Sequence, residues 1–226
     1  MAEWIRETTG GRLYPAAMPP DDVAGLRKQA DSWLQGRPGR RLQPDDWDRV
    51  PAVIRRSMAQ IARECIGEGA RPVRVLLFDK TPDSNWSVAW HQDRVVAVRE
   101  RAEVPGFGPW SIKDGVPHVE PPVAVLEGVA TLRLHLDDCG ADNAPLKVAL
   151  GSHRLGLVPA DRAAAVAEAL PVEVCEAGAG DIWAYSTLVL HASERSRAHG
   201  HRRVLHVDFA AADLPEPLRW LDYVKE

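Results

Sequence analysis

The sequence predicts a mainly β protein with flanking helices, whose core is a sandwich, barrel or jelly roll. About eight β-prone runs, separated by Gly, Pro, Asn and Asp, fill the chain from Val73 onward. These runs do not alternate with helices, which argues against a parallel α/β sheet. Hydrophobic residues make up 45% of the chain and charged residues 27%, as in ordinary globular proteins, and 226 residues can form a single domain over 1–226 with a substantial core.

Residues 1–70 are expected to form a helical region that packs on the β core. Hydrophobic residues at helical spacing predict one helix over 20–35, capped by Asp21 or Asp22, and a second helix over 46–66. Pro51 is expected in the first turn of the second helix, where proline is tolerated.

The β core itself is expected over 72–212 and is followed by an expected C-terminal helix over 213–226. A predicted helix near 159–170 interrupts the series of strands. The predicted strands cover residues 73–79, 87–91, 94–98, 129–136, 146–150, 172–176, 181–187 and 202–210.

A long segment rich in Pro and Gly lies between the third and fourth predicted strands, over 99–122. Long irregular loops in compact domains are commonly lids or binding loops, so we predict a lid here, with a surface excursion as the alternative. In and near this segment, aromatic and basic side chains are candidate substrate contacts, although such residues are also common as core filler or solvated surface. They are Trp86, Trp90, Trp110, His118 and Lys113.

Charge and cysteine content narrow the partners and the compartment. The formal net charge of −4 argues against a nucleic-acid partner, and the basic run "HASERSRAHGHRR" is either an anion-binding segment or, more economically, a solvated loop. Cys65, Cys139 and Cys175 form no CxxC pair and are expected to be buried thiols in a reducing compartment. No apolar run reaches the roughly 18 residues of a membrane span, so we expect a cytoplasmic monomer or homodimer that acts on a small molecule.

Three His-x-Asp pairs stand out, where composition predicts on the order of 0.6. A mononuclear iron site of the facial-triad kind needs two imidazoles and one carboxylate. A His and an Asp two residues apart on a strand project to the same side, and a later strand must supply the second imidazole. His191 suits this role, because it follows the turn and strand "GDIWAYST". The pairs are His91/Asp93, His135/Asp137 and His206/Asp208.

Arg202 opens the strand that follows His191, and its planar fork can bind a carboxylate through two charge-assisted hydrogen bonds. Ser193 adds a hydroxyl nearby. His206 has no later histidine with which to form a triad, and His135 lies in a strand with leucines on its other face. We therefore expect structural or supporting roles for both, although Arg133, His135 and Asp137 share a face that can look into a cavity.

In order, the segments "WHQD", "LDDCGADNAPLKVALGSHRLG" and "GDIWAYSTLVLHASERSRAHGHRRVLHVDF" resemble the phytanoyl-CoA dioxygenase family of Fe(II)/2-oxoglutarate oxygenases, from about Val73 to Ala211. The resemblance implies a double-stranded β-helix, also called a jelly-roll or cupin-like core, with Fe(II) as cofactor and 2-oxoglutarate and O2 as co-substrates. It also implies site residues. These are His91, Asp93 and His191 as catalytic iron ligands, Arg202 and Ser193 on the distal carboxylate of 2-oxoglutarate, and Arg133 and Asn143 approaching the co-substrate.

Two positions depart from the family pattern: Ala144 stands where the family has Gly, and Leu150 where it has Pro. Both changes affect loop shape and leave the ligands in place. The activity that the resemblance implies is oxidation of a substrate C–H bond, usually hydroxylation, with formation of succinate and CO2. Because Asp93 supplies a carboxylate, halogenation is less expected.

Three other classes of function remain as alternatives. A cupin-like metal-dependent isomerase or epimerase would use the same ligand types but would not need Arg202. A non-catalytic jelly-roll ligand-binding protein would leave the ordered His, Asp, His and Arg unexplained. A zinc hydrolase lacks the support of a helical HExxH motif or a Cys pair.

Overall fold

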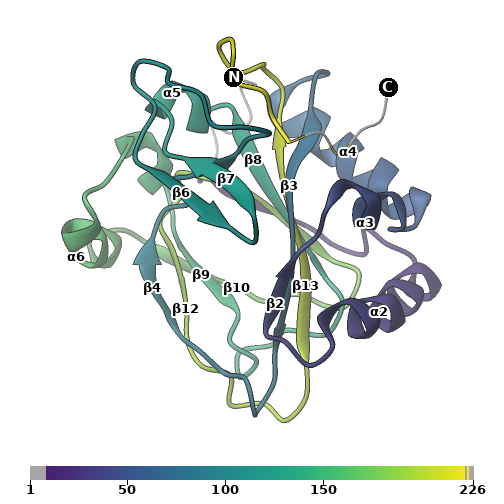
Figure 1. The fold of residues 1–226 in the computed structure, drawn as a ribbon. Coiled ribbons are helices and arrows are strands. Elements are labelled where there is room, and N and C mark those ends of the chain that lie inside the picture. Colours follow the sequence, from purple (N-terminus) through teal and green to yellow (C-terminus); the bar gives the residue numbers. More distant parts are fainter. Residues whose placement is uncertain (1–8, 222, 224–226) are drawn as a thin grey trace.

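The computed structural model describes residues 9–221 and 223, and its strands form a double-stranded β-helix (Figure 1). A six-stranded sheet has the order β1-β11-β8-β13-β3-β2, and a four-stranded sheet has the order β10-β9-β12-β4. All pairings between strands in these sheets are antiparallel, and the predicted fold class is confirmed. The strands of the first sheet are β1 (Gly11–Tyr14), β2 (Gly39–Arg41), β3 (Arg71–Lys80), β8 (Val129–His135), β11 (Ile182–Ser186) and β13 (Arg202–Ala210); those of the second are β4 (Val88–His91), β9 (Leu146–Ala149), β10 (Val172–Cys175) and β12 (His191–Ser193).

The outer face of the six-stranded sheet packs against α2 (Pro20–Leu34) and α4 (Ala52–Ile66), which cover it in Figure 1. Leu77, Leu134 and Leu205 of the sheet share one apolar core with Leu26 and Ile54 of the helices, and all five are fully buried. This packing explains why β8 and β13 are buried along their whole length: their other face lines the interior of the β-helix.

The inner face of the same sheet is polar, and the strand register aligns its side chains in rows. Residues directly opposite each other in antiparallel strands project from the same face. Leu76 on β3 is opposite His206 on β13, which is in turn opposite Arg133 on β8. Two residues further along β13, Asp208 is opposite Arg74. Polar side chains from two rows therefore face the second sheet, with Leu76 as an apolar member of the first row.

The N-terminal helices form as predicted, with different ends. Pro19 is the N-cap of α2, and Asp21 and Asp22 lie in the first turn without capping it, so the predicted capping role was wrong. The predicted helix over 46–66 is two helices, α3 (Pro44–Asp48) and α4. Pro51 is the N-cap of α4 rather than part of its first turn, because a proline disfavours helical conformation in the residue before it.

The segment over 99–122 is more regular than predicted. It contains β6 (Trp110–Lys113) and β7 (Val116–Val119), which pair with each other and, through β7, with β5 (Val96–Ala97) in a third sheet. The two residues of the connecting turn, Asp114 and Gly115, both have positive φ, which suits a tight hairpin. A short helix, α5 (Val123–Leu126), follows this hairpin. The role of the segment as a lid stays a prediction.

The helix expected over 213–226 is absent from residues 213–221, where the chain forms turns and a bridge between Trp220 and Val98. Pro215 and Pro217 account for the difference, because proline lacks the N–H that a helix interior requires. Of the rest of this segment, Tyr223 is buried, and residues 222 and 224–226 lie outside the described residues.

Two smaller expectations can be compared with the structure. The helix predicted near 159–170 is present as a 3-10 turn, Ala160–Arg162, followed by α6 (Ala163–Glu168), and another 3-10 turn covers Ser152–Leu155. The three cysteines are buried free thiols, as predicted. Within 9–221, none of the helices is long and apolar enough to cross a membrane.

The C-terminal end of α2 gives a stability prediction. Gln35 caps the helix in the left-handed region, at φ 50° and ψ 44°, and is exposed. Gln35→Gly should raise the free energy of unfolding by about 0.5–1 kcal/mol, because glycine adopts this conformation without strain. Urea unfolding measures the change. Ser32→Gly, at an exposed position inside the same helix, should lower stability by about 0.5 kcal/mol, and equal effects of the two variants would contradict the explanation.

Candidate metal centre

His91, Asp93 and His191 come together where β4 and β12 pair. His91 ends β4 and is directly opposite His191 at the start of β12, and Asp93 follows two residues after His91. One ligand atom from each of the three residues lies within 4.8 Å of the others. Nε2 of His191 is 4.0 Å from Oδ2 of Asp93, and the two imidazole centroids are 4.2 Å apart. Two imidazoles and a carboxylate therefore converge on one point.

Hydrogen bonds to the backbone orient both imidazoles for metal binding. Nδ1 of His91 lies 2.8 Å from the carbonyl oxygen of Ala89, and Nδ1 of His191 lies 3.0 Å from that of Val189. A carbonyl oxygen can only accept, so Nδ1 carries the proton in each ring and Nε2 keeps its lone pair. This arrangement fixes the tautomer that a metal-ligating histidine needs.

The charges around the triad favour the protonation states of metal ligands. Burial lowers the pKa of His191 to about 4, with His91 acting in the same direction and Asp93 opposing it, so the imidazole is neutral at pH 7. Burial by itself raises the pKa of Asp93, but Arg74, His191 and His206 outweigh burial and hold that pKa well below its usual range. Asp93 is therefore ionised at neutral pH.

The His206/Asp208 pair lies next to the triad and contacts it through Arg74. Asp208 accepts hydrogen bonds from Thr131 Oγ1 (2.8 Å) and Arg74 Nε, and its Oδ1 lies 3.1 Å from His206 Nε2. Nη2 of the same Arg74 lies 3.4 Å from Asp93 Oδ2. Arg74 thus bridges two carboxylates, and Asp208 holds the guanidinium in position against the candidate ligand.

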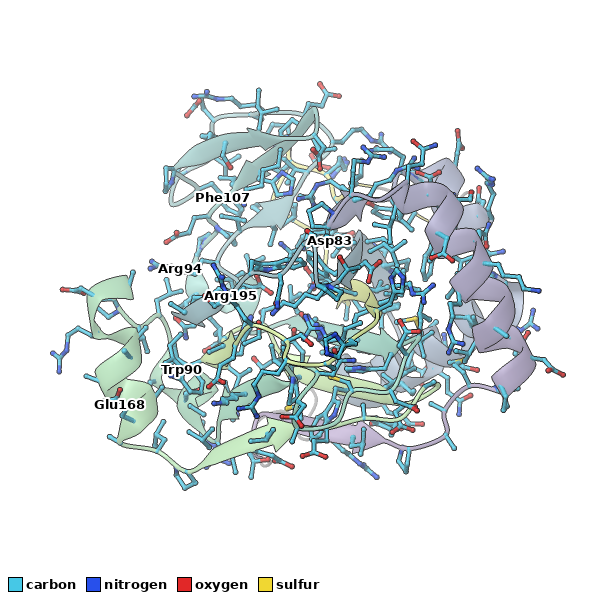
Figure 2. The ribbon with its side chains drawn as sticks, turned by 90° about the horizontal axis from the view of Figure 1, so that it is seen from below. Asp83, Trp90, Arg94, Phe107, Glu168 and Arg195 are labelled. Carbon is cyan, nitrogen blue, oxygen red and sulfur yellow. The ribbon has the colours of Figure 1, made fainter. Side chains whose placement is uncertain are left out.

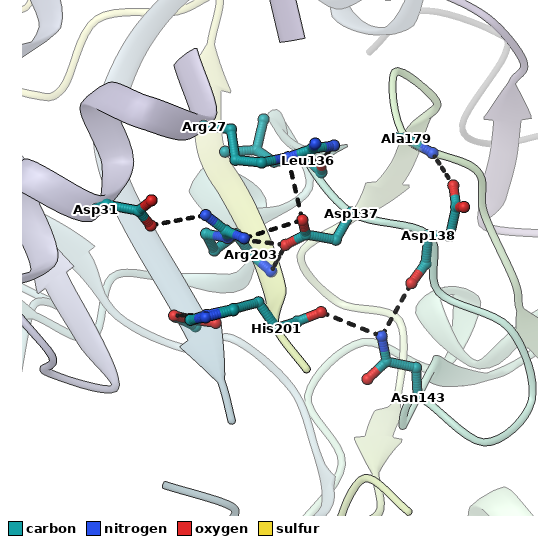
Figure 3. Close-up of polar contacts among 10 residues, drawn as sticks. Arg27, Asp31, Leu136, Asp137, Asp138, Asn143, Ala179, His201 and Arg203 are labelled. Atoms are coloured by element: carbon teal, nitrogen blue, oxygen red, sulfur yellow. Dashed lines mark hydrogen bonds and ion pairs between the residues drawn. The ribbon is translucent and has the colours of Figure 1, made fainter. Parts of the chain in front are cut away.

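The third pair, His135/Asp137, is divided between two faces. Asp137 accepts hydrogen bonds from Arg203 and pairs with Arg27 outside the β-helix (Figure 3). The idea that Asp137 looks into the cavity together with Arg133 and His135 was therefore wrong, because β8 ends at His135 and the alternation of a strand does not continue to Asp137. Burial lowers the pKa of His135 to about 3.

Beside the triad lies a cavity of about 120 Å³ between the two sheets. Its lining includes Arg133, Ser193 and Arg202, which were predicted to bind the co-substrate. Asp93 is the one carboxylate among the described residues that line it. The lining residues are Leu76, Phe78, Trp86, Val88, His91, Asp93, Arg133, Leu146, His191, Ala192, Ser193, Arg202 and His206.

The end of the cavity near Ser193 is cationic. Nε of Arg133 and Nε of Arg202 are buried and, among the described residues, have no hydrogen-bond partner. Lys80 Nζ donates to Ser193 Oγ (3.0 Å) and to the carbonyl oxygen of Glu194 (2.7 Å). Burial, followed by repulsion from Arg202 and Arg133, lowers the pKa of Lys80 to about 7. Two arginines with an unused Nε–H donor each, and the Lys80 amine nearby, are the kinds of group that bind carboxylates in proteins.

Lys80 is a site residue that was not predicted from the sequence. It is 1% exposed, lies opposite Arg202 in the register of β3 and β13, and lies 5.1 Å from the centroid of the Trp86 ring. A lysine at the end of a strongly apolar run, "VRVLLFDK", is the signal that was available. The alternation from Leu76 through Phe78 to Lys80 places it on the inner face.

Asn143 does not line the cavity. Its Nδ2 donates to the carbonyl oxygens of Asp138 (2.9 Å) and His201 (3.3 Å) (Figure 3). Its Oδ1 accepts from Ser196 Oγ (2.9 Å), so the amide ties loops together. The next residue, Ala144, has φ 49°, the left-handed conformation in which the family pattern has Gly, and its carbonyl oxygen accepts a hydrogen bond from Arg202.

The four substrate candidates that lie outside the cavity lining have other surroundings. Trp90 packs beside α6 (Figure 2), and Trp110 packs in the apolar cluster under the third sheet. His118 is fully buried, with Nδ1 2.9 Å from the carbonyl oxygen of Val116, and Lys113 is exposed on β6. Trp86 alone among the aromatic candidates lines the cavity.

A double-stranded β-helix with two histidines and an aspartate converging beside an internal cavity defines the class: jelly-roll proteins with a candidate mononuclear metal site. Within this class, residues 13–204 match the sequence model of the family described as Phytanoyl-CoA dioxygenase (PhyH). The chain belongs to the phytanoyl-CoA dioxygenase family.

Three solved structures are examples of the same fold. AviO1 from Streptomyces viridochromogenes Tue57 is 21% identical, with 95% of this chain and 96% of that chain covered and a TM-score of 0.65. The epimerase SnoN in complex with Fe3+, alpha ketoglutarate and nogalamycin RO is 17% identical, with 100% and 92% covered and a TM-score of 0.67. HygX from Streptomyces hygroscopicus with nickel and 2-oxoglutarate bound is 15% identical, with 95% and 87% covered and a TM-score of 0.62.

At these identities the likeness shows the fold alone. A search of curated protein sequences finds no match to this chain.

Proposed function

We propose that this protein is an Fe(II)/2-oxoglutarate-dependent dioxygenase that hydroxylates a C–H bond of a small molecule and converts 2-oxoglutarate and O2 to succinate and CO2. The observation that carries the proposal is the cavity, which has the His, Asp, His triad on its wall and unpaired cationic donors at its Ser193 end. SnoN and HygX, which share the fold, were each solved with a metal ion and 2-oxoglutarate (alpha ketoglutarate) bound, and this supports the proposal.

His91, Asp93 and His191 would hold Fe(II), which suits two neutral imidazoles and one carboxylate. When bound, the iron supplies the oxidising chemistry that amino acid side chains lack. The role of the protein is to present ionised Asp93 and two Nε2 lone pairs at one point, with the backbone fixing the rings.

Arg202, Lys80 and Ser193 would hold the distal carboxylate of 2-oxoglutarate. Ser193 lies two residues beyond His191 on β12, a rise of about 6.6 Å along a strand, which suits the length of a five-carbon dicarboxylate. Arg202 offers a planar guanidinium and Lys80 a point charge; Lys80 donates to Ser193 Oγ on β12, and Arg202 donates to the carbonyl oxygen of Ala144. A metal-dependent isomerase that uses no 2-oxoglutarate would have no need of this cationic end.

Hydroxylation is proposed ahead of halogenation because Asp93 supplies the carboxylate that would hold the metal position a halide needs, whereas desaturation and ring closure stay open. The carbocyclase SnoK and the epimerase SnoN share the fold, so the outcome needs a direct test. A screen of small molecules for substrate-dependent succinate release, followed by mass spectrometry under 18O2, provides it. A product that gains one labelled oxygen supports hydroxylation. A product that has lost two hydrogens, or that has unchanged mass, would exclude it.

The pKa of Lys80 predicts how 2-oxoglutarate affinity depends on pH. A bound carboxylate favours protonated Lys80 and raises its pKa above the value of about 7 in the free protein. The affinity should therefore fall by about tenfold between pH 6.5 and pH 8.5, because the amine must take up a proton on binding. Calorimetric titration with 2-oxoglutarate, in the presence of Zn(II), measures the slope.

Lys80→Met keeps the apolar stem of the side chain and removes the titrating group. This variant should bind 2-oxoglutarate more weakly at pH 6.5 and show a flat profile, whereas Lys28→Met, at an exposed position on α2, should keep the wild-type slope. An unchanged slope in Lys80→Met would assign the pH dependence to another group and remove Lys80 from the proposed site.

A further inference from the structure

Arg41 on β2 carries a buried guanidinium with unused donors. Its side chain is 7% exposed, and within the described part of the chain its Nε and Nη1 have no hydrogen-bond partner. The carboxylate paired with it is Asp114, whose Oδ2 lies 3.8 Å from Nε and whose side chain is 70% exposed. This distance is too long for a hydrogen bond. A buried charge without close partners is unfavourable, because water no longer solvates it. Arg41 therefore has two donors available for an anion.

The strand register places Arg41 on the inner face of the six-stranded sheet. Arg41 is opposite Leu76, and residues opposite each other in antiparallel strands share a face. Leu76 lines the cavity beside the metal centre, but Arg41 does not. Arg41 therefore lies on β2, one strand beyond the β3 residue Leu76 that lines the cavity, and on the same face of the sheet. It is separate from Arg202 and Lys80.

A second cationic side chain, Lys113 of β6, belongs to the hairpin that contacts Arg41. Figure 1 shows the tip of the β6–β7 hairpin directed towards β2, and the ion pair between Asp114 and Arg41 joins the two elements. Lys113 precedes this turn. The residue is exposed, but partial burial lowers the pKa of its amine, with Arg74 and Arg41 acting in the same direction and Asp93 opposing them. Because Lys113 adjoins Asp114, the residue that pairs with Arg41, it brings a second positive charge to this end of the hairpin.

The other nitrogen groups nearby already have roles. Arg74 is paired with Asp93 and Asp208. His118 is neutral at pH 7, because burial lowers its pKa to about 4, and its Nδ1 donates to the carbonyl oxygen of Val116. The Nε2 of His118 is consequently an acceptor and would not hold an anion. Arg41 and Lys113 are left as the donors.

We propose that Arg41 and Lys113 bind an anionic group of the substrate, a carboxylate or a phosphate, between β2 and the β6–β7 hairpin. This inference rests on the proposed function, because it names the substrate class of the same site. The Nε and Nη1 donors of Arg41 can each bind an oxygen of such a group, and Lys113, next to Asp114 in the hairpin, adds a second positive charge. An anion held between them would also tie the hairpin of the predicted lid to the sheet. Neutral small molecules are accordingly expected to be poor substrates.

The test follows the Nε–H resonances of the arginines in the full chain, with Zn(II) in place of iron, by 15N NMR. Inorganic phosphate and acetate are added separately at constant ionic strength, and the Arg41 signal is identified by its loss in Arg41→Lys. The Arg41 signal should shift saturably with at least one of the two anions, and the stronger one identifies the group as phosphate or carboxylate. An Arg41 signal that neither anion moves at tens of millimolar would overturn the inference.

Matched lysine variants test the second contact. Lys113→Gln should raise the dissociation constant of the stronger anion by about tenfold, whereas Lys28→Gln, an equal change of charge on α2, should leave it within about twofold. Equal effects of the two variants would exclude Lys113. Addition of 2-oxoglutarate reports on Arg202 through a different resonance, so a failure at Arg41 and a failure of the proposed function are seen separately.

Discussion

Replacement of His91 by alanine is expected to weaken metal binding by more than about 100-fold and to abolish succinate formation. Two ligands would remain, Asp93 and His191, and among the described residues the cluster has no further His, Cys, Asp or Glu to replace His91. His91 is only partly buried, so the variant should keep its fold. Anaerobic calorimetry with Fe(II) measures the affinity, and circular dichroism checks the fold.

His135→Ala is the matched control, since His135 belongs to another His-x-Asp pair and its partner Asp137 faces the outside. This variant should bind Fe(II) within about threefold of the wild type, because no ligand of the proposed site is removed. If both variants lost the metal equally, or if His91→Ala retained it, the assignment of the triad would be wrong.

Arg202→Gln is expected to weaken the binding of 2-oxoglutarate by about 100-fold, equivalent to about 2.7 kcal/mol, because it removes a charge-assisted bidentate contact. Metal affinity should stay within about twofold, since Arg202 lies near Ala144 and Ser193 and does not touch the three ligands. Titration of the Zn(II) form with 2-oxoglutarate, together with a separate Fe(II) titration, distinguishes the two effects.

Arg203→Gln provides a control at the neighbouring position of the same strand. Arg203 points to the outer face, where it pairs with Asp31 and Asp137 (Figure 3), so its loss should reduce stability and leave 2-oxoglutarate affinity within about threefold. A loss of affinity in Arg203→Gln comparable to that in Arg202→Gln would mean that general loss of positive charge, and not a specific contact, explains the result.

The triad could be predicted from sequence because its spacing follows from strand geometry. A His and an Asp two residues apart, and a histidine from a strand after a glycine turn, have few ways to lie in a jelly roll, and the motif order selected His91 over the two other pairs. The structure brings these three residues together, and their role as metal ligands stays a proposal. Arg133, Ser193 and Arg202 line the cavity beside the triad, and their contact with 2-oxoglutarate stays a prediction.

Long-range register accounts for most of what sequence reasoning missed. Lys80 lies opposite Arg202, and Arg41 lies opposite Leu76, only because β2, β3 and β13 pair in one register, which local patterns do not reveal. Asn143 was assigned from the resemblance, but its amide satisfies backbone carbonyls in the loops. The predicted helix boundaries were wrong at prolines. Pro51 lies between two helices that were predicted as one, and Pro215 and Pro217 interrupt the predicted C-terminal helix.

The most direct test of the proposed function is the visible spectrum of the protein under anaerobic conditions with Fe(II) and 2-oxoglutarate. The geometry predicts a weak charge-transfer band that appears only when both are added, because the triad leaves positions for a chelating keto acid and the cationic end of the cavity holds its far carboxylate. The band should be absent from Arg202→Gln at a concentration that saturates the wild type. A folded wild-type protein that binds Fe(II) but gives no band with excess 2-oxoglutarate would contradict the account.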